Sequence, residues 1–236
     1  MSRFEAYPIT ASFSIEVVKP KRRISSEMAF LIDEVWKKLS ADNDELFNGS
    51  LLSFQDFNGS KIIADFAEYK LFLAQREVPE LREWLEIRPI SASSITMAAD
   101  SYLVGQRSAR VTTDPLAYEL APSGTIDDEA DDRGKINLQM PFVKELIEET
   151  AIPQEMIKSV KPFLLVFDKM TLSWELCAEI IADDGVIKNF EYPVKEYKDL
   201  LWVPRKNMPI FRAGREDEFV PLSLFLLDYV NTHVTL

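Results

Sequence analysis

The sequence predicts an α/β protein in which a mixed β-sheet combines with a few helices. Several short segments alternate apolar and polar residues or concentrate β-branched ones, and both patterns are typical of strands. Helical spacing of apolar residues is found in fewer segments, and strands are predicted on both sides of the best of them. This order favours an α+β or α/β sandwich over a doubly wound parallel sheet. With 47% hydrophobic residues, the 236-residue chain can bury a substantial core.

The N-terminal part is predicted to contain both strands and helices. Its elements are, in order, a strand in residues 9–18, a helix from Ser25 or Ser26 to Leu39, paired strands in 46–67 and helical segments in 68–86. Asn58-Gly59 is a turn signal between the paired strands. Arg88-Pro89 marks a boundary, because the residue before a proline avoids the helical region. We therefore expect an N-terminal α+β subdomain in residues 1–88 and a second domain in residues 89–236.

The second domain is predicted to be richer in strands. Its elements are strands in residues 90–97, 102–106, 118–120, 163–167, 173–181 and 200–203, and helices in 141–151 and 220–230. Pro141 is tolerated in the first turn of the first of these helices. Pro153 prevents that helix from continuing.

The composition excludes several classes of function. A formal charge of −12 argues against non-specific nucleic-acid binding, which needs a basic surface. Cys177 and His233 are the single cysteine and the single histidine, so an intrachain disulfide and a cysteine-rich zinc site are excluded, and the composition argues against most histidine-dependent sites. The N-terminus lacks an apolar signal core, and no segment approaches the roughly 18 apolar residues of a membrane span. We expect a cytoplasmic protein without a membrane or nucleic-acid partner.

The predicted helix around residue 145 has an apolar face and a carboxylate face. Glu145, Glu148 and Glu149 share one side, because positions i, i+3 and i+4 lie together on a helix. Like charges at this spacing repel by a few tenths of a kcal/mol per pair. A hard divalent cation would turn the repulsion into a binding site, since it prefers several carboxylate oxygens. The alternative is a solvated glutamate-rich surface.

Residues 118–152 resemble the signature of the Nudix hydrolases, G-x5-E-x7-R-E-U-x-E-E-x-G-U, where U is aliphatic. The second half of the pattern is matched by Glu145, Leu146, Glu148, Glu149 and Ile152. Gly124 can serve as the leading glycine, but the first glutamate of the pattern falls on Ala130. Lys144 replaces the arginine, and Ala151 replaces the last glycine, where a chain that needs positive φ would carry about 1 kcal/mol of strain. The segment therefore resembles a degenerate Nudix box.

Other segments extend the likeness over most of the chain. Residues 103–108 resemble the strand that precedes the Nudix glycine loop, and residues 196–204 resemble a late acidic turn and strand of the family. The N-terminal half, with Phe47-Asn48-Gly49 and Phe57-Asn58-Gly59, is similar to the extra region of the UDP-glucose pyrophosphatase-like branch. The resemblance implies an α/β/α sandwich around a mixed sheet, with an N-terminal α+β extension.

The resemblance also implies an activity and its site. The reaction would be hydrolysis of a nucleoside diphosphate derivative with Mg²⁺ or Mn²⁺, most similar to cleavage of a UDP-sugar to UMP and a sugar 1-phosphate. Its metal ligands would be Glu145, Glu148, Glu149 and the Gly124 carbonyl, with Glu148 and Glu149 catalytic, Lys144 supporting the carboxylates, and Arg107 and Arg110 binding the substrate. The base stays open among Glu175, Glu179 and Glu196.

Two rival functions are compatible with the same residues. The departures in the first half of the box favour a Nudix-fold protein that has lost turnover and binds nucleotides or partners in a regulatory role. An interaction protein that uses its acidic surface is the second rival. Arg107 and Arg110 could equally form surface ion pairs. The sequence leaves the nucleobase, the sugar and the formation of a homodimer open.

Overall fold

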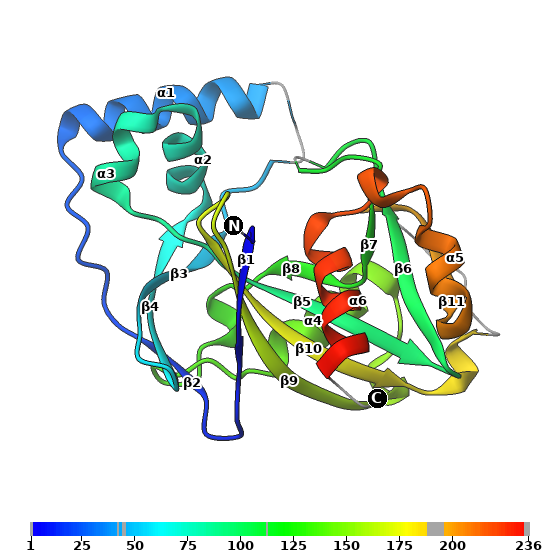
Figure 1. Cartoon of the computed structure of the whole chain (residues 1–236). Coiled ribbons are helices and arrows are strands. Elements are labelled where there is room, and N and C mark those ends of the chain that lie inside the picture. The colour runs from blue at the N-terminus through cyan, green and yellow to red at the C-terminus, as the bar shows by residue number, and fades with distance from the viewer. Residues whose placement is uncertain (1, 42, 44–45, 112, 188–195, 234–236) are drawn as a thin grey trace. The chain divides into compact units, whose positions relative to one another are not determined.

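The computed structural model of the protein describes residues 2–41, 43, 46–111, 113–187 and 196–233, and it confirms the predicted α/β class (Figure 1). The chain divides into two compact units. Unit 1 comprises Met1–Ser91, Thr125–Leu138 and Leu165–Leu176, and unit 2 comprises Ala92–Gly124, Gln139–Leu164 and Cys177–Leu236. A division of the chain at residue 88 stays a prediction. No described helix combines the length and the apolar character needed to cross a bilayer.

Unit 1 contains the α+β extension expected at the N-terminus. The sheet of this extension is formed by β2 (Ser14–Val17), β4 (Lys61–Glu68) and β3 (Ser50–Phe57), in that order. The central strand β4 pairs parallel with β2 and antiparallel with β3, so this small sheet is mixed. Gly59 has φ +94° in the β3–β4 turn, and the Asn58 side chain accepts a bond of 2.9 Å from the Lys61 N–H. The predicted hairpin is thus confirmed.

Three helices accompany this sheet in unit 1. They are α1 (Ser26–Ala41), α2 (Tyr69–Glu77) and α3 (Arg82–Leu85). Ile32 from α1, Leu71 from α2, Leu85 from α3 and Leu51 from β3 belong to one buried cluster. The apolar spacing of these segments therefore places Ile32 and Leu85 correctly on packed faces, whereas Leu31 and Trp84, which were expected on the same faces, are exposed.

The larger sheet has eight strands. Its main order is β1 (Phe4–Pro8), β9 (Ile157–Asp168), β10 (Ser173–Ala182), β5 (Ile90–Ala98), β6 (Ser101–Arg107) and β11 (Tyr197–Pro204). Two short strands join it from the side: β7 (Tyr118–Leu120) pairs with β6, and β8 (Ser123–Thr125) pairs with β5. The helices of unit 2 are α4 (Met140–Thr150), α5 (Met208–Arg212) and α6 (Pro221–His233).

Two strand predictions were wrong in extent. Residues 9–18 are not one strand, because the chain turns after Pro8, where the Phe13 N–H donates to the Thr10 carbonyl at 2.9 Å. The strand β1 before that turn was missed, since it is short and only partly buried. Strand β9 begins at Ile157 rather than at residue 163. Its first half carries exposed polar side chains, which hide the strand in a hydrophobicity pattern.

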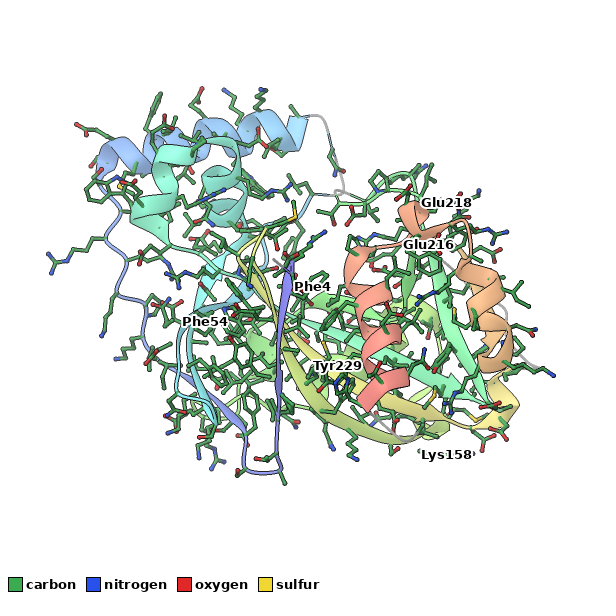
Figure 2. The ribbon with its side chains drawn as sticks, in the orientation of Figure 1. Phe4, Phe54, Lys158, Glu216, Glu218 and Tyr229 are labelled. Carbon is green, nitrogen blue, oxygen red and sulfur yellow. The ribbon has the colours of Figure 1, made fainter. Side chains whose placement is uncertain are left out.

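Trp174 at the start of β10 lies in an aromatic cluster of unit 1. Its ring stacks on Phe54 of β3, labelled in Figure 2, with a centroid distance of 4.5 Å and an interplanar angle of 18°. Phe167 approaches the same indole at 4.8 Å. Trp174 is buried, so this tryptophan belongs to the core.

Candidate functional site

Helix α4 presents the two faces that its sequence predicts. Phe142 and Leu146 are fully buried and anchor the apolar side. The carboxylate side is not uniform, because Glu149 is buried, Glu145 is half-buried and Glu148 is exposed. Glu145 and Glu149 are one helical turn apart, so their side chains lie along one row. The pair is therefore directed toward the protein, whereas Glu148 faces solvent.

Ala151 ends α4 in a left-handed conformation. Its φ is 54° and its ψ is 16°, and its N–H donates to the Ile147 carbonyl at 2.9 Å. This position is a helix C-cap, where glycine is favoured because it lacks a Cβ. The strain expected from the sequence, where alanine replaces the family's glycine, is thus present in the backbone.

Replacing Ala151 with glycine should raise the free energy of unfolding by about 0.5–1 kcal/mol, because the relief of left-handed strain exceeds the added unfolded-state entropy. Chemical denaturation of both proteins would measure the change. Ala41, at the end of α1, is a control at a position without positive φ, where glycine should not stabilise. A destabilised Ala151→Gly variant would contradict the strain argument.

Gly124 on β8 lies directly against the carboxylate of Glu145. A Cβ built on Gly124 would overlap the Glu145 Cδ and both of its carboxylate oxygens. Only glycine therefore allows the backbone of β8 and this carboxylate to approach so closely. Gly124 and the glutamate helix are thus in contact, which places a backbone strand beside an acidic side chain, while their shared role as metal ligands stays a prediction.

The carboxylate of Glu149 contacts Ser123, the residue that precedes Gly124 on β8. Its Oε2 accepts a bond of 3.3 Å from the Ser123 N–H and a bond of 2.8 Å from the Tyr197 hydroxyl. Burial, followed by the charges of Glu145 and Glu119, raises the pKa of Glu149 well above its ordinary value. Several negative groups thus act on one buried carboxylate.

Arg107 and Glu119 form a buried ion pair next to this carboxylate. The Arg107 Nη1 donates to both oxygens of Glu119, each at 2.8 Å. The pair joins the end of β6 to β7, and Gly105 of β6 pairs with Glu119 of β7 in the sheet. Burial lowers the pKa of Arg107, but the charge of Glu119 raises it, and the net shift of this pKa is upward. The Arg107 Nε is buried and has no hydrogen-bond partner among the described residues.

Tyr197 lies between the two buried carboxylates. Its hydroxyl bonds to Glu149 and is also within hydrogen-bonding reach of Glu119. Burial, together with the charges of Glu119 and Glu149, raises the pKa of Tyr197 well above its ordinary value. The phenol therefore keeps its proton and acts as a hydrogen-bond donor.

The other predicted site residues occupy different surroundings. Arg110 is exposed in the turn after β6, where its N–H donates to the Ser108 hydroxyl at 3.3 Å. Lys144 is half-buried on α4. Among the three proposed bases, Glu196 is the one whose charge raises the pKa of Glu149, while Glu175 and Glu179 lie on β10. The roles of these residues stay predictions.

Glu119, Tyr197 and Gly105 were missed as site residues from the sequence. Both Glu119, in a three-residue strand, and Tyr197, after an acidic turn, lie in segments that resemble the Nudix family, but neither occupies a fixed position of the signature. The signal that could have found Glu119 was a lone carboxylate inside an otherwise apolar strand. Such a residue requires a cationic or hydrogen-bonding partner when the strand is buried.

The donor set fits a hard divalent cation. Among the residues that the structure describes, no group of three or more His, Cys, Asp or Glu side chains is arranged to hold a metal ion. Mg²⁺, however, keeps several waters and needs only one or two carboxylates. Glu145 and Glu149, with the backbone of Gly124, supply such an all-oxygen set, and the neighbouring negative charges that raise the pKa of Glu149 would be offset by a bound cation.

Neither a protein-family model nor a curated protein sequence matches the chain. Solved structures of Nudix proteins resemble its fold at low sequence identity. The Nudix domain of NrtR from Shewanella oneidensis, in complex with ADP ribose, is 16% identical over 63% of this chain and 89% of its own, with a TM-score of 0.47. The MutT protein from Methanosarcina mazei Go1 is 16% identical over 62% of this chain and 95% of its own, with a TM-score of 0.41. A bifunctional NMN adenylyltransferase/ADP ribose pyrophosphatase from Francisella tularensis is 16% identical over 70% of this chain and 48% of its own, with a TM-score of 0.43.

Proposed function

We propose that this protein is a Nudix-type hydrolase that uses a divalent cation to cleave a nucleoside diphosphate linked to another group. The observation that carries the proposal is the convergence of two helix carboxylates on β8: Glu145 lies against Gly124, and Glu149 accepts from Ser123. These residues belong to the two parts of the chain that resemble the Nudix box. The resemblance of the N-terminal half supports a UDP-sugar as the substrate, cleaved to UMP and a sugar 1-phosphate.

The residues divide into ligands and residues that act on water. Glu145, Glu149 and the Gly124 carbonyl would hold Mg²⁺ or Mn²⁺. When bound, the cation would neutralise phosphate charge and lower the pKa of a water molecule. Glu148 is solvent-facing on the same helix, so it is placed to orient water or to bind a second ion. Lys144 supports the carboxylates through its charge, although a lysine lacks the planar fork of an arginine.

The reaction adds water across the phosphoric anhydride. The water oxygen forms a bond to one phosphorus atom, and the bond between that phosphorus and the bridging oxygen breaks. The proton of the attacking water passes to a carboxylate base, and we assign this role to Glu196 among the three candidates. Its support is electrostatic proximity, since the charge of Glu196 acts on both Glu149 and Glu119.

We assign substrate binding to Arg107 and Arg110, which would contribute in different ways. Arg107 is engaged by Glu119, so it would contribute positive charge near the site rather than a mobile side chain. Arg110 is exposed and can move toward a phosphate group or a uracil ring. A small-molecule nucleotide is the partner that these features support.

A panel of nucleoside diphosphate derivatives tests the proposal. UDP-glucose, other UDP-sugars, ADP-ribose and a dinucleotide would be incubated with the protein and Mg²⁺ or Mn²⁺, and release of the nucleoside monophosphate would be followed by chromatography. We expect turnover of at least one compound, with UDP-sugars preferred, and its loss when EDTA removes the metal. Absence of metal-dependent turnover across the panel would refute the enzymatic proposal.

A regulatory nucleotide-binding protein is the second candidate. It is favoured by Ala130, which stands where the family pattern has a glutamate and is buried in unit 1. A buried alanine cannot supply a carboxylate ligand. Calorimetric titration that detects a nucleotide diphosphate derivative, combined with no turnover of the same compound, would favour this function over hydrolysis.

A further inference from the structure

The Glu149 carboxylate, on which the proposed function depends, is held by few contacts. Its hydrogen bonds from the described residues come from the Ser123 N–H at 3.3 Å and the Tyr197 hydroxyl at 2.8 Å. Both bonds end on Oε2, which leaves Oε1 for a further partner. The bond from Tyr197 has the usual length of an O–H···O hydrogen bond, whereas the bond from the Ser123 N–H is long. Tyr197 is therefore the main constraint on the carboxylate.

We propose that Tyr197 is a positioning residue that orients the Glu149 carboxylate toward a bound divalent cation. This inference rests on the proposed metal site, but it assigns a role to a residue outside the signature-like segment 118–152. Tyr197 comes from the first position of β11, whereas Glu149 comes from the last turn of α4. The hydroxyl thus couples two elements that are separated by 48 positions in the sequence.

Gly105 makes room for the positioning residue. A Cβ built on Gly105 would overlap the ring of Tyr197 at its Cδ1 and Cε1 atoms. Tyr197 pairs with Arg107 in the antiparallel β6–β11 ladder, and Gly105 pairs with Leu200. The ring consequently lies along β6, over the glycine. Any larger residue at this position would push the hydroxyl away from Glu149.

The Arg107–Glu119 ion pair determines which carboxylate accepts the hydrogen bond from the Tyr197 hydroxyl. A phenol has one O–H, so it can donate to Glu149 or to Glu119, but not fully to both. Glu119 already accepts two bonds from Arg107, and its charge is compensated. The charge of Glu149 has no such cationic partner among the described ion pairs. The phenol therefore donates to Glu149, as the 2.8 Å distance shows.

The test compares Tyr197→Phe with a matched control, Tyr7→Phe. Tyr7 donates to Glu5 at 2.8 Å, so the control removes a tyrosine–glutamate bond of the same length in unit 1. Calorimetric titration with Mn²⁺ alone should show an affinity about 10–100-fold weaker for Tyr197→Phe, as for other residues that orient metal ligands. The affinity of Tyr7→Phe should stay within about twofold of the wild type. Gly105→Ala should weaken the affinity in the same direction while it retains the hydroxyl.

A second readout separates positioning from a general structural role. The unfolding midpoints of the metal-free wild type, Tyr197→Phe, Glu149→Leu and the double variant form a cycle, because leucine has no oxygen that can accept the Tyr197 bond. If Tyr197 acts through Glu149, the two shifts are non-additive, whereas independent packing effects would add. Additive midpoints, or unchanged Mn²⁺ affinity in Tyr197→Phe, overturn the inference, and so does a wild type that binds no Mn²⁺. A wild type without turnover whose Mn²⁺ affinity still depends on Tyr197 would refute the proposed hydrolysis and leave the inference intact.

Discussion

Replacing Glu149 with glutamine should reduce metal-dependent turnover by about 10²–10⁴-fold and, at the same time, stabilise the metal-free protein at neutral and alkaline pH. The loss of turnover follows because a neutral amide binds a hard cation weakly. The gain in stability follows because Glu149 is buried and repelled by the charges of Glu145 and Glu119. Glutamine keeps an oxygen that can accept the Tyr197 bond.

The sign of the pH dependence comes from the raised pKa of Glu149. The carboxyl has an ordinary pKa of 4.5, and burial with the neighbouring negative charges raises it in the folded protein. The unfolded chain therefore loses this proton at a lower pH than the folded chain does. As the pH rises from 4.5 through the folded-state pKa, the wild type loses free energy of unfolding. The glutamine variant lacks this loss, so the difference between the two proteins grows with pH.

Denaturant titrations at several pH values, with EDTA present, would measure the stability of both proteins. Glu155→Gln is a control, because Glu155 is exposed and its neutralisation should change neither stability nor turnover. Added Mn²⁺ should stabilise the wild type more than the variant, since binding to the folded state adds to its stability. A glutamine variant that is less stable than the wild type at alkaline pH would show that Glu149 is already compensated.

The glutamate helix could be predicted from the sequence because its information is local. The spacing of Phe142 and Leu146 defines the buried face of α4, and the same periodicity places Glu145 and Glu149 in one row. The strained position of Ala151 was also predicted, since it follows from a glycine-requiring helix end. The different exposure of Glu148 was not predicted, because it depends on what packs against each side of the helix.

The rest of the candidate site depends on contacts between distant segments. Arg107 meets Glu119 through the pairing of β6 with β7, and Tyr197 reaches Glu149 because β11 pairs with the other edge of β6. Strand register of this kind is set by the whole sheet rather than by neighbouring residues. The sequence therefore predicted β6, β7 and the centre of β11, but it did not show which polar side chains they bring together.

The acidic loop after β8 shows the same limit. Most of the acidic side chains from 127 to 132 are exposed, as their charge indicates. The structure adds that the loop belongs to unit 1, where Ile136 is buried and its N–H donates to the Ile15 carbonyl at 3.0 Å. An isolated apolar residue in a polar loop gave no indication of this partner.

Replacing Gly124 with alanine should separate the function of β8 from its contribution to folding. The new Cβ would overlap the Glu145 carboxylate, which is the far end of a flexible side chain. We therefore expect Glu145 to rotate away at a small cost in stability, while Mn²⁺ affinity falls by about 10–100-fold and turnover falls with it. Gly49→Ala is a control in unit 1, because its Cβ would meet only the exposed ring of Phe47.

The origin of that loss can be assigned by combining Gly124→Ala with Glu145→Gln. If the methyl group acts by displacing the Glu145 carboxylate, Gly124→Ala should cost little further Mn²⁺ affinity in the Glu145→Gln background, because the two changes remove the same ligand. Equal losses in both backgrounds would mean that Gly124 contributes through its own backbone, independently of Glu145. Wild-type affinity in the single Gly124→Ala variant would exclude Glu145 as a metal ligand in the observed conformation, since the alanine cannot coexist with that carboxylate position.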